Sequence, residues 1–206
     1  MIIIRFIYYI LLKPIGRMVF GLPEYEPKKK ATKAKSVHNH STQQNQNSQK
    51  NQSVLKGHAF EEYIAKKVSK YRGYKLKEWR GDKYADGIYA ESNLYPDLEF
   101  ELTQGSKEFR FAIECKWRNN FYDGKLELFK ESQLKNYWRY SAEKKIKVFV
   151  AIGVGSINNH PKELYIIPLS KIHSTHVYKG ELHHYRFEVF EEIKYDPISQ
   201  EIFPSR

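Results

Sequence analysis

Two acidic residues and one lysine near the middle of the chain have side chains that could do chemistry together. They lie in the stretch PDLEFELTQGSKEFRFAIECKWR, which begins at Pro96 and holds two runs of alternating apolar and polar residues around Gly105–Ser106. A Gly-first pair of this kind is typical of a two-residue type II′ hairpin turn. With that turn, Asp97 lies directly opposite Glu114, and Lys116 follows on the same face of the second strand.

The predicted hairpin has one apolar face and one charged face. The apolar cross-strand pairs are Leu98 with Ile113, Phe100 with Phe111, and Leu102 with Phe109. Like charges directly opposite each other, as Asp97 and Glu114 are here, destabilise a sheet. A divalent cation between the two carboxylates would remove this conflict, and Lys116 adds positive charge beside them. The alternative is a solvated sheet face with scattered charges, which antiparallel sheets often carry.

The order of these residues resembles a known signature. Pro96-Asp97 on one strand and Glu114-x-Lys116 on the next resemble the motif of the PD-(D/E)xK nuclease superfamily. The resemblance implies a restriction-endonuclease-like α/β fold, in which a mixed β-sheet is flanked by helices. It also implies a metal-dependent endonuclease that hydrolyses phosphodiester bonds in DNA, a deoxyribonuclease that uses Mg²⁺ or Mn²⁺. Its catalytic residues would be Asp97, Glu114 and Lys116.

Two further patterns, one on each side of this motif, resemble parts of related nucleases. The run GHAFEEYI, which begins at Gly57, resembles the first helix of Mrr-like restriction endonucleases and related resolvases. The resemblance implies that Glu61 is a further metal-site carboxylate, with Glu62 as the fallback; the alternative for Glu62 is an ordinary solvated charge on the helix. Gln133 and Tyr137 resemble the Q-x-x-x-Y element of RecB-like nucleases, which implies that they contact nucleic acid. The alternative for this pair is a surface glutamine and a tyrosine at the edge of the core.

The resemblance also implies a set of metal ligands, of which one is a backbone carbonyl. The set is Glu61, Asp97, Glu114 and the carbonyl of Cys115. The thiol of Cys115 points to the apolar face of the hairpin, which indicates a buried structural cysteine rather than a nucleophile. Mrr-like proteins usually carry Gly-Asp ahead of the catalytic strand, so Asp82 and Asp86 compete with Asp97 for the first position. We favour Asp97 because only Asp97 pairs with Glu114 in the predicted register.

Basic and aromatic residues alternate directly after the motif, from Lys116 to Tyr122. Lys116 and Arg118 could contact phosphates there, while the aromatic rings stack on bases. The alternative is a loop that packs its aromatic side chains inward.

Cutting both strands of a duplex calls for two catalytic sites, which a homodimer would supply.

The composition of the chain limits the classes of protein to which it can belong. The 206 residues are 41% hydrophobic and 29% charged, which excludes a membrane protein with several spans. A single cysteine excludes an internal disulfide framework and a zinc site built from cysteines. The net charge of +11 favours a polyanionic partner, either DNA or an anionic membrane surface, although a solubilising tail gives the same sum.

Periodicity predicts the elements that position these residues. A helix over 55–71 turns five residues inward, Leu55, Phe60, Ile64, Val68 and Tyr71, and ends before Gly73. A second helix over 131–145 turns inward Leu134, Trp138 and either Ser141 or Ala142. Strands are predicted over 74–79, 97–103, 108–117, 146–154 and 164–169, with a weaker pattern over 185–190 and a loop over 81–94. This order predicts a mixed sheet flanked by helices.

The first 53 residues differ in character from the predicted nuclease-like domain, which covers 54–206. Residues 1–23 are hydrophobic and are predicted to be an uncleaved membrane anchor or an interfacial helix, the alternative being a segment that packs on the body or on a partner. Residues 24–53 are polar and lack apolar periodicity, which predicts a disordered linker. If the anchor spans, the lysines that follow it keep the domain cytoplasmic, attached to the inner face of the membrane.

Two other functions fit the same sequence. One is a catalytically inactive nuclease-fold module that binds nucleic acid near a membrane. The other is a membrane-peripheral adaptor whose function is carried by its N-terminal segment. The presence of Asp97, Glu114 and Lys116 together argues for the enzyme over the inactive module.

Overall fold

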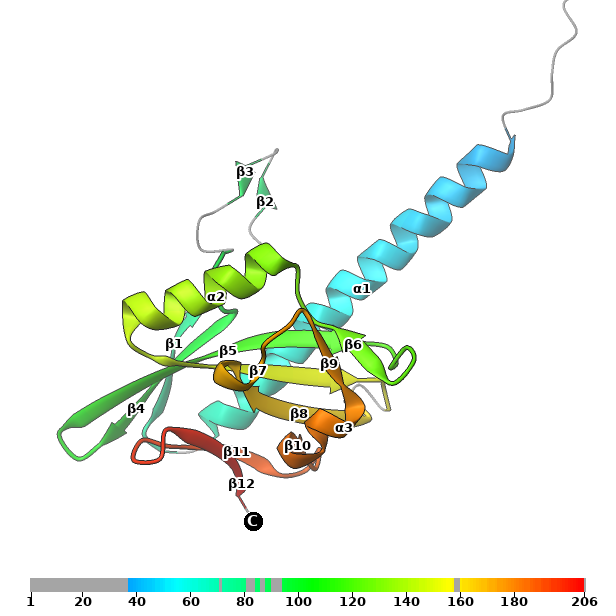
Figure 1. Ribbon diagram of the computed structural model, residues 1–206. Coiled ribbons are helices and arrows are strands. Elements are labelled where there is room, and N and C mark those ends of the chain that lie inside the picture. The colour runs from blue at the N-terminus through cyan, green and yellow to red at the C-terminus, as the bar shows by residue number, and fades with distance from the viewer. Residues whose placement is uncertain are drawn as a thin grey trace, which may run out of the picture.

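A computed structural model describes residues 37–70, 72–80, 84–85, 88–89, 94–157 and 160–205. Its centre is a six-stranded sheet in the order β1-β4-β5-β7-β8-β10 (Figure 1). These strands are β1 (Tyr74–Trp79), β4 (Leu98–Gln104), β5 (Lys107–Arg118), β7 (Lys147–Val154), β8 (Glu163–Pro168) and β10 (Arg186–Phe187). Strands β5 and β7 are parallel, and the other pairs are antiparallel. The predicted mixed sheet is therefore confirmed.

Two long helices cover opposite faces of this sheet. Helix α1 (Val37–Ser69) contributes Phe60, Ile64 and Val68 to one core cluster, in which Phe149 of β7 also lies. Helix α2 (Glu131–Lys144) contributes Tyr137 and Tyr140 to a second cluster, together with Val148, Val150 and Ile152 of β7. Successive side chains of a strand point to opposite faces, so β7 separates the two cores. The result is a helix–sheet–helix sandwich.

The hairpin of β4 and β5 has the predicted register. Leu98 pairs with Ile113, Phe100 with Phe111, and Leu102 with Phe109. Gly105 has a φ of 62°, as the first residue of a Gly-first turn requires. Because a shift of one residue would turn every apolar side chain of β4 away from the core, the two buried faces fix this register.

Helix α1 is longer than the sequence predicts at its N-terminal end. The helix begins at Val37, so residues 37–53 are helical where a disordered linker is expected. No proline or glycine interrupts this polar stretch, and a helix that is already nucleated gains one hydrogen bond for each residue that it adds. Figure 1 shows this N-terminal part of α1 extending away from the sheet. The hydrophobic segment 1–23 and the first part of the linker, 24–36, lie outside the described residues.

Membrane attachment was predicted only from residues outside this description. Within the described ranges, none of the helices combines the length and the apolar character that crossing a bilayer requires.

The inward face of α2 differs from the predicted one. Trp138 is 42% exposed, whereas Tyr137 and Tyr140 are 3% and 1% exposed. Leu134 and Ser141 are half-buried, and Ala142 is exposed. The tyrosines can turn inward because each hydroxyl finds a buried carboxylate, as described below, so the helix is rotated relative to the apolar pattern.

Several small elements complete the chain. In chain order they are β2 (Tyr84–Ala85), β3 (Ile88–Tyr89), β6 (Lys125–Glu127), η2 (Leu169–Lys171), β9 (His176–Tyr178), α3 (Lys179–Leu182), η3 (His183–Tyr185), β11 (Glu192–Asp196) and β12 (Glu201–Ser205). Strands β6 and β9 pair, as do β11 and β12. The β11–β12 hairpin was not predicted, yet Ile193 and Tyr195 from it complete the core beneath α1.

Candidate active site

The predicted site residues line one cavity of about 340 Å³ at the place where α1, α2, β4 and β5 meet. The sequence-predicted residues in its lining are Glu61, Asp97, Glu114, Cys115, Lys116, Arg118, Gln133 and Tyr137. Asp97 directly precedes β4, and the pairing of β4 with β5 brings it beside Glu114. Glu114 and Lys116 are two residues apart on β5 and so share a face. The structure thus brings together residues that are up to 76 positions apart in the chain, from Glu61 to Tyr137.

Asp97 and Glu114 are held against each other through the backbone. The N–H of Asp97 donates to Oε2 of Glu114 at 3.3 Å, and the N–H of Cys115 donates to Oδ2 of Asp97 at 2.8 Å. Each strand therefore fixes the carboxylate that the other strand carries. Two carboxylates that are fixed in this way meet a ligand without first having to be ordered.

Glu114 also receives two donors at its other oxygen. Nζ of Lys116 lies 2.5 Å from Oε1, and the hydroxyl of Tyr137 donates to the same atom at 2.7 Å. Glu114 is 2% exposed, so these partners offset the cost of burying its charge. Burial alone would lower the pKa of Lys116, but the charges of Glu114 and Asp97 outweigh burial and raise that pKa. Lys116 therefore stays a cation at neutral pH.

Glu61 brings a third carboxylate to the cavity from α1. Its Oε2 accepts a hydrogen bond from Nε1 of Trp79 at 2.9 Å and lies 3.7 Å from Nδ1 of His58. Burial, followed by the charges of Glu114 and Glu61, raises the pKa of Asp97 well above its usual range. The cavity lining thus brings three acidic side chains, Glu61, Asp97 and Glu114, close to the two cations Lys116 and Arg118.

Glu62, the fallback for Glu61, lies elsewhere. Its Oε1 pairs with Nζ of Lys66 at 2.5 Å, and its side chain is 52% exposed. Glu62 is therefore part of a surface ion pair along α1. Asp82 and Asp86, the competitors of Asp97, lie outside the described residues.

The oxygen donors of this cavity suit a hard divalent cation. Carboxylate oxygens from Asp97, Glu114 and Glu61 are the ligands that Mg²⁺ and Mn²⁺ prefer. As the side chains lie in this structure, no three His, Cys, Asp or Glu residues of the described ranges come close enough together to enclose an ion. A carbonyl ligand from Cys115 is compatible with its position on β5, between Glu114 and Lys116. The donor types at this cavity therefore fit a divalent metal ion.

The side chains of Cys115 and Tyr137 have their partners within the protein. The thiol of Cys115 packs against the core beneath α1, and burial, with the nearby acidic groups, raises the pKa of that thiol. This agrees with a structural cysteine. The ring of Tyr137 is 3% exposed, so it is buried where a nucleic-acid contact was predicted. Its hydroxyl positions Glu114 instead.

Arg118 and Gln133 support the walls of the cavity. The guanidinium of Arg118 donates to the carbonyls of Glu127, Trp117 and Leu128 at 2.6, 2.8 and 2.9 Å. Oε1 of Gln133 accepts from the N–H of Lys130 at 3.1 Å and so caps the first turn of α2. Both residues line the cavity, yet much of their hydrogen-bonding capacity is used within the protein.

A second buried carboxylate, that of Glu99, lies beside the site and was not among the predicted site residues. Glu99 is 8% exposed, and its Oε2 accepts from Tyr140 at 2.6 Å and from Arg80 at 2.7 Å. Arg80 also donates through Nη1 to the carbonyl of Pro96 at 3.1 Å and through its backbone N–H to the carbonyl of Asp97 at 2.7 Å. This network fixes the chain at the point where Asp97 enters the cavity. Its signal in the sequence is a glutamate on the α2 side of a central strand, which needs donors if it is buried.

Among known proteins, this chain has a structural neighbour but no match in sequence. No protein-family model matches the chain, and no curated protein matches it. Among solved structures, a Holliday junction resolvase of the archaeal hyperthermophile Archaeoglobus fulgidus is similar with a TM-score of 0.44 and 14% identity. The match covers 65% of this chain and 96% of the resolvase. A TM-score of this size is too low to transfer a fold family or an activity.

Proposed function

We propose that this chain is a metal-dependent endonuclease that hydrolyses phosphodiester bonds in DNA. The observation that carries the proposal is the meeting of Asp97, Glu114 and Lys116 in one cavity, with Glu61 beside them. A buried glutamate and a half-buried aspartate that lie side by side next to a charged lysine cost folding free energy, so a functional reason for the cluster is favoured.

The chemistry follows from where charge develops during the reaction. When water attacks a phosphodiester in line, negative charge builds up on the phosphoryl oxygens. The protonated ammonium of Lys116 can stabilise that charge if it turns from Glu114 to the phosphate. The hydroxyl of Tyr137 then stays on Oε1 of Glu114 and holds the carboxylate in place.

Asp97 and Glu114, with Glu61 and the carbonyl of Cys115, are the residues that would hold the metal. Mg²⁺ or Mn²⁺ bound there supplies polarisation of the phosphate and acidifies water. The hydrogen bond from the Cys115 N–H keeps Oδ2 of Asp97 on the cavity side of the strand. The indole of Trp79 donates to Oε2 of Glu61 and so fixes that carboxylate on α1.

A cleavage assay with the purified chain tests this proposal. We expect nicking or cutting of a panel of duplex, branched and single-stranded DNAs with Mg²⁺ or Mn²⁺, and no cutting by the Lys116→Ala variant. Lys171→Ala is a matched control, because Lys171 is an exposed lysine of η2 outside the cavity lining. Cleavage that persists alike in Lys116→Ala, Asp97→Ala and Glu114→Ala would show that the site is misassigned. Salt-sensitive binding of DNA without cleavage under any divalent metal would favour the inactive binding module.

A further inference from the structure

A tight hairpin turn next to the candidate active site presents an aromatic ring and a cation side by side. Tyr122 and Lys125 exchange two backbone hydrogen bonds, each of 3.0 Å, around Asp123 and Gly124. These two central residues have φ values of 50° and 68°, which is the backbone pattern of a type I′ turn. The N–H of Lys179 donates to the carbonyl of Gly124 at 2.9 Å and ties the turn to the neighbouring segment. The turn is therefore already formed in the absence of a ligand.

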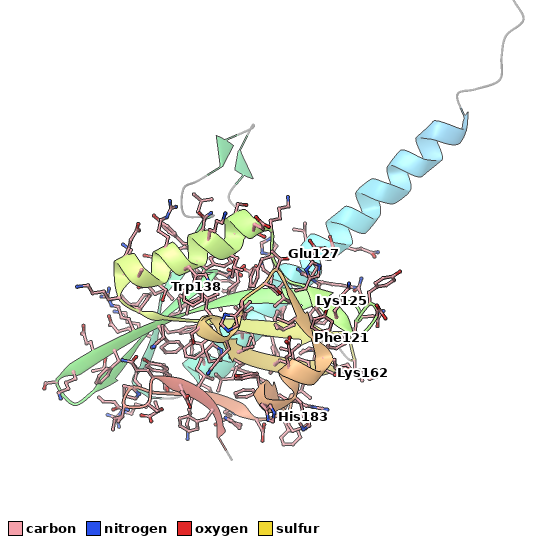
Figure 2. The ribbon with its side chains drawn as sticks, in the orientation of Figure 1. Phe121, Lys125, Glu127, Trp138, Lys162 and His183 are labelled. Carbon is pink, nitrogen blue, oxygen red and sulfur yellow. The ribbon has the colours of Figure 1, made fainter. Side chains whose placement is uncertain are left out.

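The two aromatic residues of this segment have opposite environments. Phe121 packs edge-on against Tyr165, with Nζ of Lys179 lying 4.9 Å from its ring centroid. Tyr122 is 82% exposed. Lys125 and Phe121 lie at the same edge of the body (Figure 2). A large aromatic side chain that a hydrogen-bonded turn holds in solvent is available for a partner.

The turn borders a hollow that continues into the active-site cavity. Tyr122, Lys125 and Lys130 line this second hollow, which has a volume of about 400 Å³. Arg118 and Gln133 line both the hollow and the active-site cavity, so the two spaces adjoin. A strand whose scissile phosphate lies beside Lys116 and that continues into this hollow would meet Tyr122.

The charges of the hollow suit a phosphate backbone. Arg118, Lys125 and Lys130 contribute three positive charges to the lining, and Glu127 contributes one negative charge. Within the described part of the chain, neither Lys125 nor Lys130 takes part in a salt bridge. Lysines next to an aromatic ring are the combination that binds single strands, with cations along the backbone and a ring against the base.

We propose that the Tyr122–Lys125 turn is a stacking platform for an unpaired base next to the scissile phosphate. In a continuous duplex both faces of each base are covered by neighbouring bases, so the ring of Tyr122 has no base face to meet. The substrate would then be DNA that is single-stranded or splayed open beside the cut, as at a branch or a flap. This inference rests on the proposed function, because it takes the cavity as the place of the scissile phosphate.

Equilibrium binding in Ca²⁺, which separates binding from cleavage, tests the platform. The probes are three labelled DNAs of equal length: a full duplex, a duplex with a splayed end, and a single strand. We expect Tyr122→Ala to weaken binding of the splayed and single-stranded probes by about tenfold, which corresponds to the loss of one stacked base. We expect Tyr122→Phe to bind as the wild type does, and the full duplex to be bound equally by the wild type and both Tyr122 variants.

Two further measurements make the assignment specific. Phe190→Ala is the control, because Phe190 is 81% exposed and lies outside the lining of the hollow. This variant should bind all three probes as the wild type does. For Lys125→Gln we expect the slope of log affinity against log salt concentration to fall in magnitude by about one, which corresponds to one fewer released counterion.

The outcomes separate the platform from the enzyme. Equal affinities of wild type and Tyr122→Ala for the splayed and single-stranded probes would overturn the platform, even if the wild type cleaves DNA. An equal loss for all three probes would also overturn it, since the ring would then not distinguish unpaired bases. Selective loss in a protein that never cleaves DNA would keep the platform and reject the enzyme.

Discussion

Removing a single hydroxyl from Tyr137 should separate the role of this residue in folding from its role in the site. Tyr137 and Tyr140 lie on one helix, are 3% and 1% exposed, and each donates to a buried glutamate. Their acceptors lie in different places, because Tyr137 donates to Glu114 in the cavity and Tyr140 donates to Glu99 outside its lining. The variants Tyr137→Phe and Tyr140→Phe are therefore a matched pair.

The size of both effects follows from the hydrogen bonds. A hydrogen bond to a charged group contributes about 1.5–3 kcal/mol, so each variant should lose about 2 kcal/mol of unfolding free energy. In Tyr137→Phe, Oε1 of Glu114 keeps only Lys116 as the partner described above. The ammonium is then held more firmly on Glu114 and is less available to a phosphate. We expect cleavage to slow by about 10- to 100-fold, the usual effect of removing a residue that orients a catalytic ligand.

Urea unfolding measures the first effect, and cleavage rate at saturating DNA measures the second. Both variants should unfold at lower urea with an unchanged slope, and Tyr140→Phe should cleave within about threefold of the wild type. If both variants lost the same stability and cleaved equally well, Tyr137 would be a core residue with no role in the site. If both slowed cleavage equally, the cavity would depend on general packing of α2, and the specific role of the Glu114 contact would be rejected.

Three further results are expected. Burial alone would raise the pKa of Glu99, but the hydrogen bonds from Tyr140 and Arg80 outweigh burial and lower this pKa. The stability that Glu99 contributes is therefore present above about pH 4.3 and is lost as the pH falls further. Urea midpoints measured from pH 7 to pH 3 should fall less steeply in Glu99→Gln than in the wild type. Saturating Mg²⁺ should raise the melting temperature of the wild type by about 5 °C and leave that of Asp97→Asn unchanged, which a thermal melt without DNA measures. Gly153→Ala should lower the free energy of unfolding in urea by about 1–3 kcal/mol. A Cβ on Gly153 would lie 2.7 Å from the ring of Phe60 and push α1 away from the sheet. Unchanged stability would contradict this close packing.

The hairpin that carries the site was predictable because its signals are local. A Gly-first turn and two alternating runs fix the pairing of Asp97 with Glu114 from sequence alone, and the structure has this register. The end of the first helix was predictable for a similar reason. Gly73 has a φ of 98°, and a Cβ there would lie 2.9 Å from the carbonyl oxygen of Thr103, so other residues are excluded at this turn.

Contacts between distant segments were not predictable in the same way. The β11–β12 hairpin follows the main elements and packs Ile193 and Tyr195 under α1, but short strands of mixed character give no periodic signal. The helical state of residues 37–53 was missed for another reason. Low apolar content argues against a packed helix, yet it does not prevent a packed helix from continuing beyond its core.

The face of α2 shows why hydrophobic periodicity fails at a site of this kind. Periodicity placed Leu134 and Trp138 inward, because they are the most apolar residues at helical spacing. In the structure the buried positions belong to tyrosines, since Glu114 and Glu99 on the sheet face beneath α2 need donors and a phenol supplies one on an apolar ring. Buried acids on a strand thus decide which side of the covering helix faces inward. A sequence rule follows from this: where a strand is predicted to bury glutamates, the covering helix should be oriented by its tyrosines before its leucines.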